Sequence, residues 1–279
     1  MNSFCILCGP ARLKKWRKVD GYTVVLCQSC SLGFIHPQPT AEAREGQYRE
    51  NLTSPADYYV ATTDVDRETF RKRLAFLEEH MPPGRLLDVG CNVGTFLQVA
   101  TQRGWQPAGI EPNPQAAQQA AQKGLPVQVG FFSPELLDTF PSDFDLINMF
   151  DVIEHFADPR EAVKLAAQKI QKGGFLSLST PNFRNPIARF FQVKPLEHLF
   201  YFDAQTLTRL LQENGFQVVR ILRTTRRRDF RNILRSTTKI NTGLRWLIQG
   251  AILLGAADGL SWLCASLIRD ELWVLAKRT

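Results

Sequence analysis

At 279 residues, the chain is long enough for one full α/β domain and a small additional module. Hydrophobic residues make up 44% and charged residues 22%, which excludes a mainly disordered chain. The net charge of +7 is unevenly spread, because residues 220–235 hold seven arginines and a single acid. Such a cluster attracts the phosphates of nucleic acid, anionic lipid or nucleotide sugar, or is simply a solvated face.

Four of the six cysteines form two Cys-x-x-Cys pairs within the first forty residues: Cys5, Cys8, Cys27 and Cys30. The chain opens without the charged and apolar regions of a secretory signal, so we expect a cytoplasmic, reducing setting. There the spacing predicts four thiolates around a structural zinc ion, with no coordination position left for catalysis. The alternative is four free cysteines in a module without other visible support.

The cysteines delimit a zinc-ribbon-like module over residues 1–40, too small to form a core alone. The polar residues 41–65 are expected to form a linker or lid. From residue 66 the apolar pattern predicts a helix with Asp66 as its N-cap, which Pro82 and Pro83 end.

Strands and helices are then expected to alternate, which is typical of a doubly wound α/β domain over residues 66–279. Seven strands are predicted, at residues 85–89, 107–111, 126–129, 144–150, 175–179, 216–222 and 272–276. Helices are predicted at residues 93–103, 113–123, 159–171 and 204–214. The sequence therefore predicts a mostly parallel seven-stranded sheet.

A helical insertion, residues 224–270, separates the last two predicted strands. It contains the arginine cluster and then an apolar run, residues 244–268, that Arg245, Gln249 and Asp258 interrupt. A single membrane crossing is excluded, because the last strand must rejoin the sheet. Two interpretations stay open: a packed lid or homodimer surface, and a peripheral contact of residues 224–268 with the inner face of a membrane.

The strongest motif joins the first predicted strand to the next helix, in residues 86–96, with the sequence LLDVGCNVGTF. Gly90 and Gly94 would let the backbone approach a ligand, because a Cβ there would collide with it. About twenty residues later, Glu111 ends the second strand, where an acid can accept both hydroxyls of a ribose. A dinucleotide-binding dehydrogenase is disfavoured, since its Gly-x-Gly-x-x-Gly fingerprint is absent.

This pattern, with residues 144–147, 151–155, 173–176 and 197–202, resembles class I S-adenosylmethionine-dependent methyltransferases over most of residues 66–222. The resemblance implies a Rossmann-like methyltransferase fold, S-adenosylmethionine as cofactor, and a turn that binds its amino-acid part. Asn92 stands where the family usually has glycine, and Phe131 lies in a segment that lacks the acid often used for the adenine amine. The implied cofactor residues are Asp88, Gly90, Asn92, Gly94, Glu111, Phe131 and Asp151.

Two Glu-His pairs follow the fourth and fifth strands, Glu154-His155 and Glu197-His198. Ligands of open α/β sheets bind beyond the carboxyl ends of the strands, so both pairs should reach one crevice. A histidine can take up the acceptor's proton while a neighbouring carboxylate fixes its tautomer. By resemblance to sugar methyltransferases with an N-terminal zinc module, His198 with Glu197 is the expected base. His155 and Glu154 are then expected to orient groups or to bind substrate.

The expected acceptor is a sugar or glycan precursor, nucleotide-linked or lipid-linked, as in the polysaccharide-pathway enzymes of bacteria that this arrangement resembles. Whether O, C or N receives the methyl group stays open. One alternative is a methyltransferase of ribosomal or transfer RNA with a zinc-ribbon recognition module. Nucleic acid is the less favoured partner, because the module interleaves few aromatic and basic residues. The other alternative is a non-catalytic zinc-ribbon adaptor with a vestigial fold, which the intact glycine motif disfavours.

Overall fold

The computed structural model describes residues 2–49, 56–140, 142–225 and 269–279. Its helices and strands alternate over most of the chain, and the strands form two sheets. In chain order they are β1 (Asn2–Cys5), β2 (Gly9–Val19), β3 (Tyr22–Cys27), β4 (Gly33–Ile35), α1 (Ala41–Arg49), α2 (Ala56–Glu78), β5 (Arg85–Val89), α3 (Thr95–Gln102), β6 (Gln106–Glu111), α4 (Pro114–Gln122), β7 (Val127–Val129), α5 (Pro134–Leu137), β8 (Phe144–Phe150), η1 (Ile153–His155), α6 (Pro159–Lys169), β9 (Ile170–Pro181), α7 (Pro186–Phe191), β10 (Phe200–Tyr201), α8 (Ala204–Gln212), β11 (Phe216–Thr224) and β12 (Glu271–Arg278).

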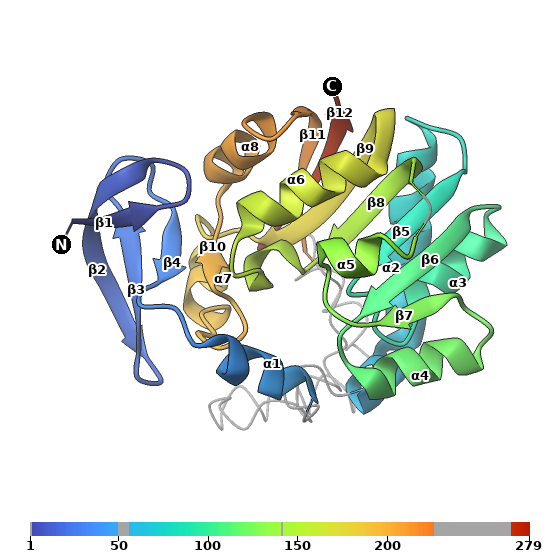
Figure 1. The fold of residues 1–279 in the computed structure, drawn as a ribbon, viewed down its shortest axis with the longest axis horizontal. Coiled ribbons are helices and arrows are strands. Elements are labelled where there is room, and N and C mark those ends of the chain that lie inside the picture. The colour runs from blue at the N-terminus through green and yellow to red at the C-terminus, as the bar shows by residue number, and fades with distance from the viewer. Residues whose placement is uncertain (1, 50–55, 141, 226–268) are drawn as a thin grey trace, which may run out of the picture.

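The central sheet has seven strands in the order β11-β12-β9-β8-β5-β6-β7 (Figure 1). The strands from β5 to β9 pair in parallel, and β12 runs antiparallel between β9 and β11. The predicted doubly wound, mostly parallel sheet is therefore confirmed. After β5 the chain moves outward to β6 and β7 and then returns to β8 on the other side of β5. Parallel sheets bind ligands where the strand order reverses in this way, beyond the carboxyl ends of β5 and β8.

Helices cover both faces of this sheet. In the view of Figure 1, α2 and α3 pack together behind it, and α6 and α8 pack in front against β9 and β11. Their apolar sides are buried, as the fully covered Leu74, Leu97 and Leu207 show. Burial on both faces explains why the strands read as continuous apolar runs rather than as alternating ones.

The segment expected to be a linker or lid is largely helical. Helix α1 lies within residues 41–65, and α2 begins at Ala56 rather than at Asp66. Residues 56–78 contain neither glycine nor proline, so nothing in the chain stops the helix at the expected cap. Asp66 is a buried residue inside α2, and its prediction as the N-cap was wrong.

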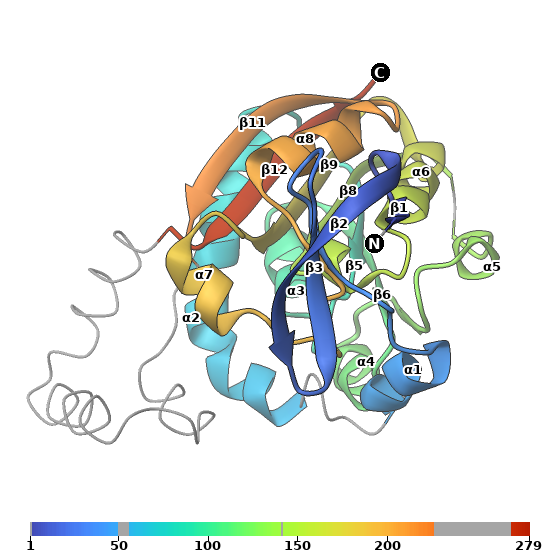
Figure 2. The same ribbon diagram turned by 90° about the vertical axis from the view of Figure 1, so that its left-hand side faces the viewer.

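The N-terminal module forms a second, antiparallel sheet in the order β1-β2-β3-β4-β10. Its last strand, β10, is distant in the sequence from the other four and follows β9 and α7. Figures 1 and 2 show this sheet standing beside α7 and α8. Leu13, Val25 and Phe34 of the module belong to the same buried cluster as Leu199 and Phe202. The module thus shares its core with the larger domain, as its small size requires.

The helical insertion that the sequence places at residues 224–270 lies almost wholly outside the described residues. The two interpretations of its apolar run therefore stay predictions. None of the helices in the described part of the chain combines the length and apolarity that a membrane crossing needs.

Candidate active site

The turn after β5 takes the strained form that its sequence predicts. Gly90 and Asn92 have φ of +74° and +51°, and the Gly90 amide donates to the Ile110 carbonyl at 2.8 Å. Asn92 is one of the residues that tolerate a positive φ. At Gly94, also with positive φ, an added Cβ would collide with Leu125 and lie 3.0 Å from the Ala120 Cβ. Gly94 is therefore required by the packing of the chain on itself, and its contact with a ligand stays a prediction.

Glu111 ends β6 with its carboxylate beneath this turn. It is 4% exposed, and its two oxygens accept backbone amides of Asn92 and Asn113, each at 2.8 Å. A carboxylate offers about four acceptor positions, so positions remain for the two hydroxyls of a ribose. Burial raises the pKa of Glu111 to about 7. The acid predicted to bind ribose thus lies at the correct strand end and ionises near neutral pH.

Asp88 links β5 to β8, the two neighbouring strands at which the strand order of the sheet reverses. Its Oδ1 accepts the side-chain amide of Asn148 at 2.7 Å, and these residues face one another across the β5–β8 pair. Burial raises the pKa of Asp88 to about 7. This bond ties β5 to β8, and contact of Asp88 with the cofactor stays a prediction.

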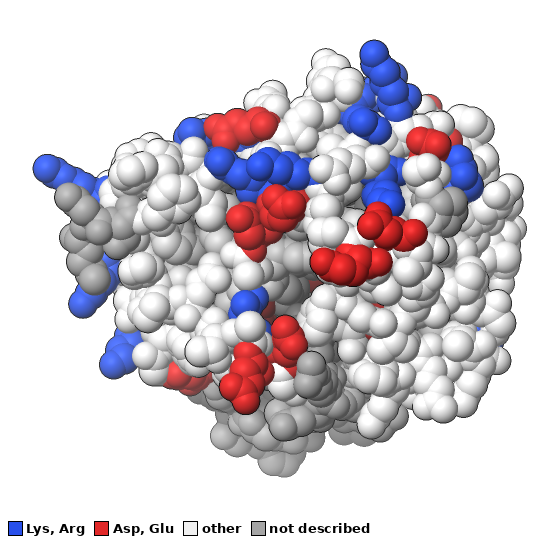
Figure 3. Space-filling view, in the orientation of Figure 1, with Lys and Arg blue, Asp and Glu red and all other residues white. Residues whose placement is uncertain are grey.

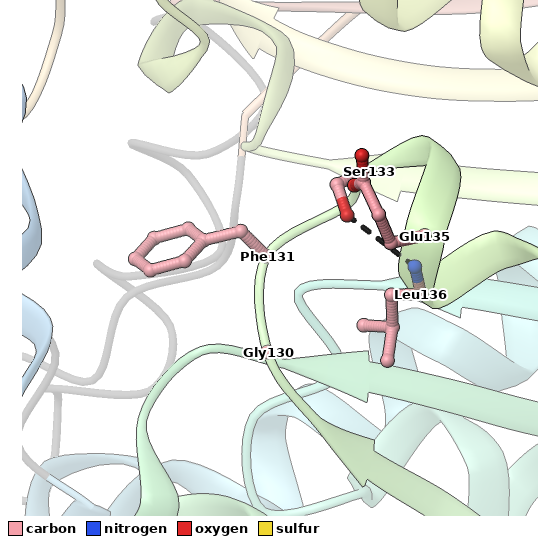
Figure 4. A pocket seen from close by; sticks show the side chains of 5 residues that line it. All are labelled: Gly130, Phe131, Ser133, Glu135 and Leu136. Atoms are coloured by element: carbon pink, nitrogen blue, oxygen red, sulfur yellow. Dashed lines mark hydrogen bonds between the residues drawn. The ribbon is translucent and has the colours of Figure 1, made fainter.

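Phe131 stands at the edge of an open depression of about 480 Å³ that Gly130, Ser133, Glu135 and Leu136 also line. The Gly130 amide donates to the Glu111 carbonyl at 3.0 Å, which places this segment beside the end of β6. In Figure 4 the Phe131 ring extends away from Ser133 and Leu136. A ring that is 41% exposed here can stack on a flat heterocycle, as the missing acid in this segment suggests.

Asp151 follows β8 and adopts a positive φ of 54°. Its amide donates to the Ser179 carbonyl at 3.0 Å, and the Ser179 hydroxyl donates to its Oδ1 at 3.1 Å. Asp151 is thereby held at the carboxyl ends of β8 and β9, at the same edge of the sheet as Glu111 on β6, which is two strands from β8.

His155 and His198 meet edge to face, with ring centroids 5.0 Å apart and planes at 90°. The convergence expected of the two Glu-His segments is therefore found. The Nδ1 of His198 lies 2.8 Å from the Gln192 carbonyl. A carbonyl can only accept, so Nδ1 carries the proton and Nε2 keeps its lone pair.

Burial lowers the pKa of both histidines, that of His155 to about 4 and that of His198 well below its usual value. Both rings are consequently neutral at physiological pH. A neutral ring with a fixed tautomer can accept a proton from an acceptor hydroxyl.

The carboxylate expected to orient His198 was wrongly chosen. Glu197 lies 3.1 Å from the Lys194 ammonium, and the Gln192 carbonyl takes its place at His198. Adjacency in sequence does not decide this, because residues 195–197 form a turn in which the amides of Glu197 and His198 both donate to the Lys194 carbonyl.

Glu154 lies beside His155 and His198, although the sequence predicts for it only an orienting or substrate-binding role. It is 1% exposed, and neither carboxylate oxygen has a hydrogen-bond partner among the described residues. Burial and the charge of Asp151 raise the pKa of Glu154. Glu154, His155 and His198 each bring one potential ligand atom within 4.8 Å of the others, so they could also hold a cation. The signal in the sequence is the DVIEH segment, which forms η1 directly after β8.

The sulfur atoms of Cys5, Cys8, Cys27 and Cys30 lie within 4.8 Å of one another. The Cys5 and Cys30 sulfurs are 3.7 Å apart, and the Cys30 thiol lowers the pKa of Cys5 to about 5 by hydrogen bonding. Each pair occupies a turn beyond a strand end, β1 for the first and β3 for the second. Four converging thiols on two turns fit a tetrahedral metal ion.

Comparison with known proteins also indicates a methyltransferase. The model of a family described as "Methyltransferase domain" matches residues 61–221. A ubiquinone biosynthesis O-methyltransferase of Alkalilimnicola ehrlichii is 32% identical over 120 residues, 41% of this chain and 48% of that protein. The chain spans about half the length of the curated relatives that it matches.

Solved structures show the same fold at low sequence identity. A SAM-dependent methyltransferase from Archaeoglobus fulgidus has a TM-score of 0.55 and 21% identity, with 79% of this chain and 99% of that chain covered. A SAM-dependent methyltransferase from Thermotoga maritima, described as a possible histamine N-methyltransferase, has a TM-score of 0.56 and 16% identity, covering 84% of this chain and 100% of that one.

Proposed function

Because this chain belongs to the methyltransferase-domain family, we propose that it transfers a methyl group from S-adenosylmethionine to a hydroxyl oxygen of a small molecule. The observation that carries the proposal is the His155–His198 pair at the carboxyl edge of the same sheet that buries Glu111. A cofactor site and a neutral proton acceptor then face one crevice.

The residues present fit S-adenosylmethionine. Glu111 would accept the ribose hydroxyls, Phe131 would stack on the adenine, and the turn from Gly90 to Asn92 would receive the amino-acid part. When bound, the cofactor supplies an electrophilic methyl group. The part of this chain is to hold the acceptor oxygen in line and to take up the proton that this oxygen loses, at Nε2 of His198.

The lowered pKa of His155 and His198 indicates which kind of acceptor hydroxyl they can deprotonate. A weak base removes a proton most readily from an acidic hydroxyl, and a phenol has a pKa of about 10. A ring hydroxyl, such as that of a phenol or quinol, is therefore favoured over an aliphatic sugar hydroxyl. The relatives named for ubiquinone biosynthesis support the same choice, whereas the comparisons lend no support to the sugar or glycan precursor.

An RNA acceptor is the weaker alternative. In Figure 3, acidic and basic side chains lie interspersed over the described part of the face shown, where an RNA-binding surface would be dominated by basic ones.

The four cysteines are proposed to hold one structural zinc ion. The support is their spacing and the convergence of their sulfurs.

The test is a matched set of acceptors incubated with purified protein and S-adenosylmethionine, with S-adenosylhomocysteine quantified by mass spectrometry. A polyprenylated catechol should yield product, and a nucleotide sugar should yield none above background. Product from the sugar alone would overturn the choice of acceptor. The absence of detectable S-adenosylmethionine binding by calorimetry would overturn the cofactor assignment.

A further inference from the structure

Strand β10 begins two residues after His198, yet it belongs to the sheet of the cysteine module. Phe200 pairs with Phe34 and Tyr201 with Gly33 of β4, antiparallel. From this pairing we infer that β4 of the module positions His198 against His155, so that the module is part of the catalytic apparatus. The inference rests on the proposed role of His198 as proton acceptor.

A run of backbone hydrogen bonds connects the module to both histidine segments. The Ile35 amide of β4 donates to the Leu199 carbonyl at 2.9 Å. The Leu199 amide then donates to the Glu154 carbonyl at 2.8 Å. Leu199 is adjacent to His198, and Glu154 is adjacent to His155. Two bonds therefore relate β4 to both histidines, and displacement of β4 would change their separation.

Side-chain packing makes this connection tight. The rings of Phe34 and Phe200 are 6.0 Å apart, and both side chains are buried. At Gly33, an added Cβ would lie 3.1 Å from both Tyr201 and Phe183. Little space is left for β10 to move without β4, because closely packed interiors transmit displacement.

The metal-binding turns are anchored on the larger domain at a second point. Arg209 of α8 donates to the Leu7 carbonyl at 2.7 Å and contacts the Cys8 sulfur at 3.4 Å. A thiolate at Cys8 strengthens this contact through charge. Zinc would thus stabilise the turn that Arg209 holds, and through β3 it would stabilise β4.

The β4 side of the module differs from the binding edge of a tethered recognition module. A module that captures a partner through its strands needs an unpaired edge or an exposed apolar face. Here the β4 edge is paired with β10, and Phe34 and Ile35 are buried against the larger domain. At this edge, β4 therefore makes its contacts with other parts of the same chain.

The test uses full-length protein as purified, with its zinc content measured, and two variants of one module. Phe34→Ala removes the ring that packs on Phe200, and Phe4→Ala is the matched control because Phe4 is 64% exposed on β1. Phe34→Ala should lower turnover by about 10- to 100-fold, as small misplacements of catalytic groups do, and leave S-adenosylhomocysteine affinity within about twofold. Phe4→Ala should resemble the parent protein in both.

Amide hydrogen exchange supplies a readout that needs no acceptor. Exchange in residues 193–203 should accelerate in Phe34→Ala and after zinc chelation, while residues 85–111 keep their protection. If Phe34→Ala does not fold, Phe34→Leu, which loses the ring but stays apolar, should give a smaller change of the same kind. Unchanged exchange in both Phe34 variants would overturn the inference. A wrong acceptor would abolish turnover in every variant and leave the exchange pattern as expected.

Discussion

Glu111 occupies an unusual position for a carboxylate, since it is buried, accepts two amides and titrates near neutrality. In the proposed function the ribose hydroxyls donate to the ionised carboxylate, whereas the free protein holds a proton on this group below its pKa of about 7. Cofactor binding should therefore release this proton at acidic pH.

We accordingly expect S-adenosylhomocysteine affinity to rise between pH 6 and 8 in the parent protein. Glu111→Gln should weaken binding by about 1–3 kcal/mol at pH 8 and remove the pH dependence, because its amide does not titrate. Calorimetric titration at four pH values measures both effects. Glu79→Gln, at an exposed position, is the control, and an equally pH-dependent Glu111→Gln would contradict the prediction.

The Gln192 carbonyl fixes the tautomer of His198. His198→Ala should lower turnover by about 10²–10⁴-fold with little change in cofactor affinity, and His155→Ala should have a milder effect. Steady-state kinetics on the true acceptor provide the measurement. Glu197→Gln should be nearly neutral, because that side chain pairs with Lys194. A large loss in Glu197→Gln would restore the carboxylate–histidine pairing that the sequence suggests.

At the scale of elements, the sequence predicted the regular part of the fold well. Continuous apolar strands and capped helices carry their own local signals, and all seven predicted strands of the central sheet are present. The two residues of β10 carry no such signal, because only their pairing with β4 makes them a strand. The tautomer partner of His198 was beyond prediction for a related reason. It is a backbone carbonyl six residues away, and any residue type could supply it.

The element-scale prediction concerns the module that carries the four cysteines. Protein prepared without chelators should contain one zinc ion per chain, and Cys27→Ser should lose it, because three thiolates bind the ion less well than four. Elemental analysis and the visible spectrum of a cobalt-substituted sample measure this. Cys91→Ser, outside the cluster, should keep its zinc. Full zinc occupancy in Cys27→Ser would remove that residue from the ligand set.

Across the described part of the molecule, the fold raises the pKa of three buried acids: Asp88, Glu111 and Glu154. An acid whose pKa is higher in the folded state stabilises the fold below its unfolded pKa. That contribution is lost as the pH rises through the folded pKa. For Glu111 the interval runs from 4.5 to about 7, and the full effect is about 3 kcal/mol.

The ligand-free protein should therefore lose stability as the pH rises from about 4.5 to 7. Glu111→Gln should flatten part of this slope, since one titrating group is removed. Urea unfolding at constant metal concentration gives the free energy at each pH, and the difference between the two proteins isolates Glu111. Parallel curves for the two proteins would show that its pKa is not raised in the fold.

The pairing of β4 with β10 also has a consequence for synthesis. Residues 33–35 leave the ribosome long before residues 200–201, so the first sheet stays open at one edge while most of the chain is made. Unpaired edges invite association with other chains, and contacts so distant in sequence form late. Metal bound early by the cysteines would hold β1 to β3 together during that interval. The histidines would then come into register only after the nascent chain has closed this edge.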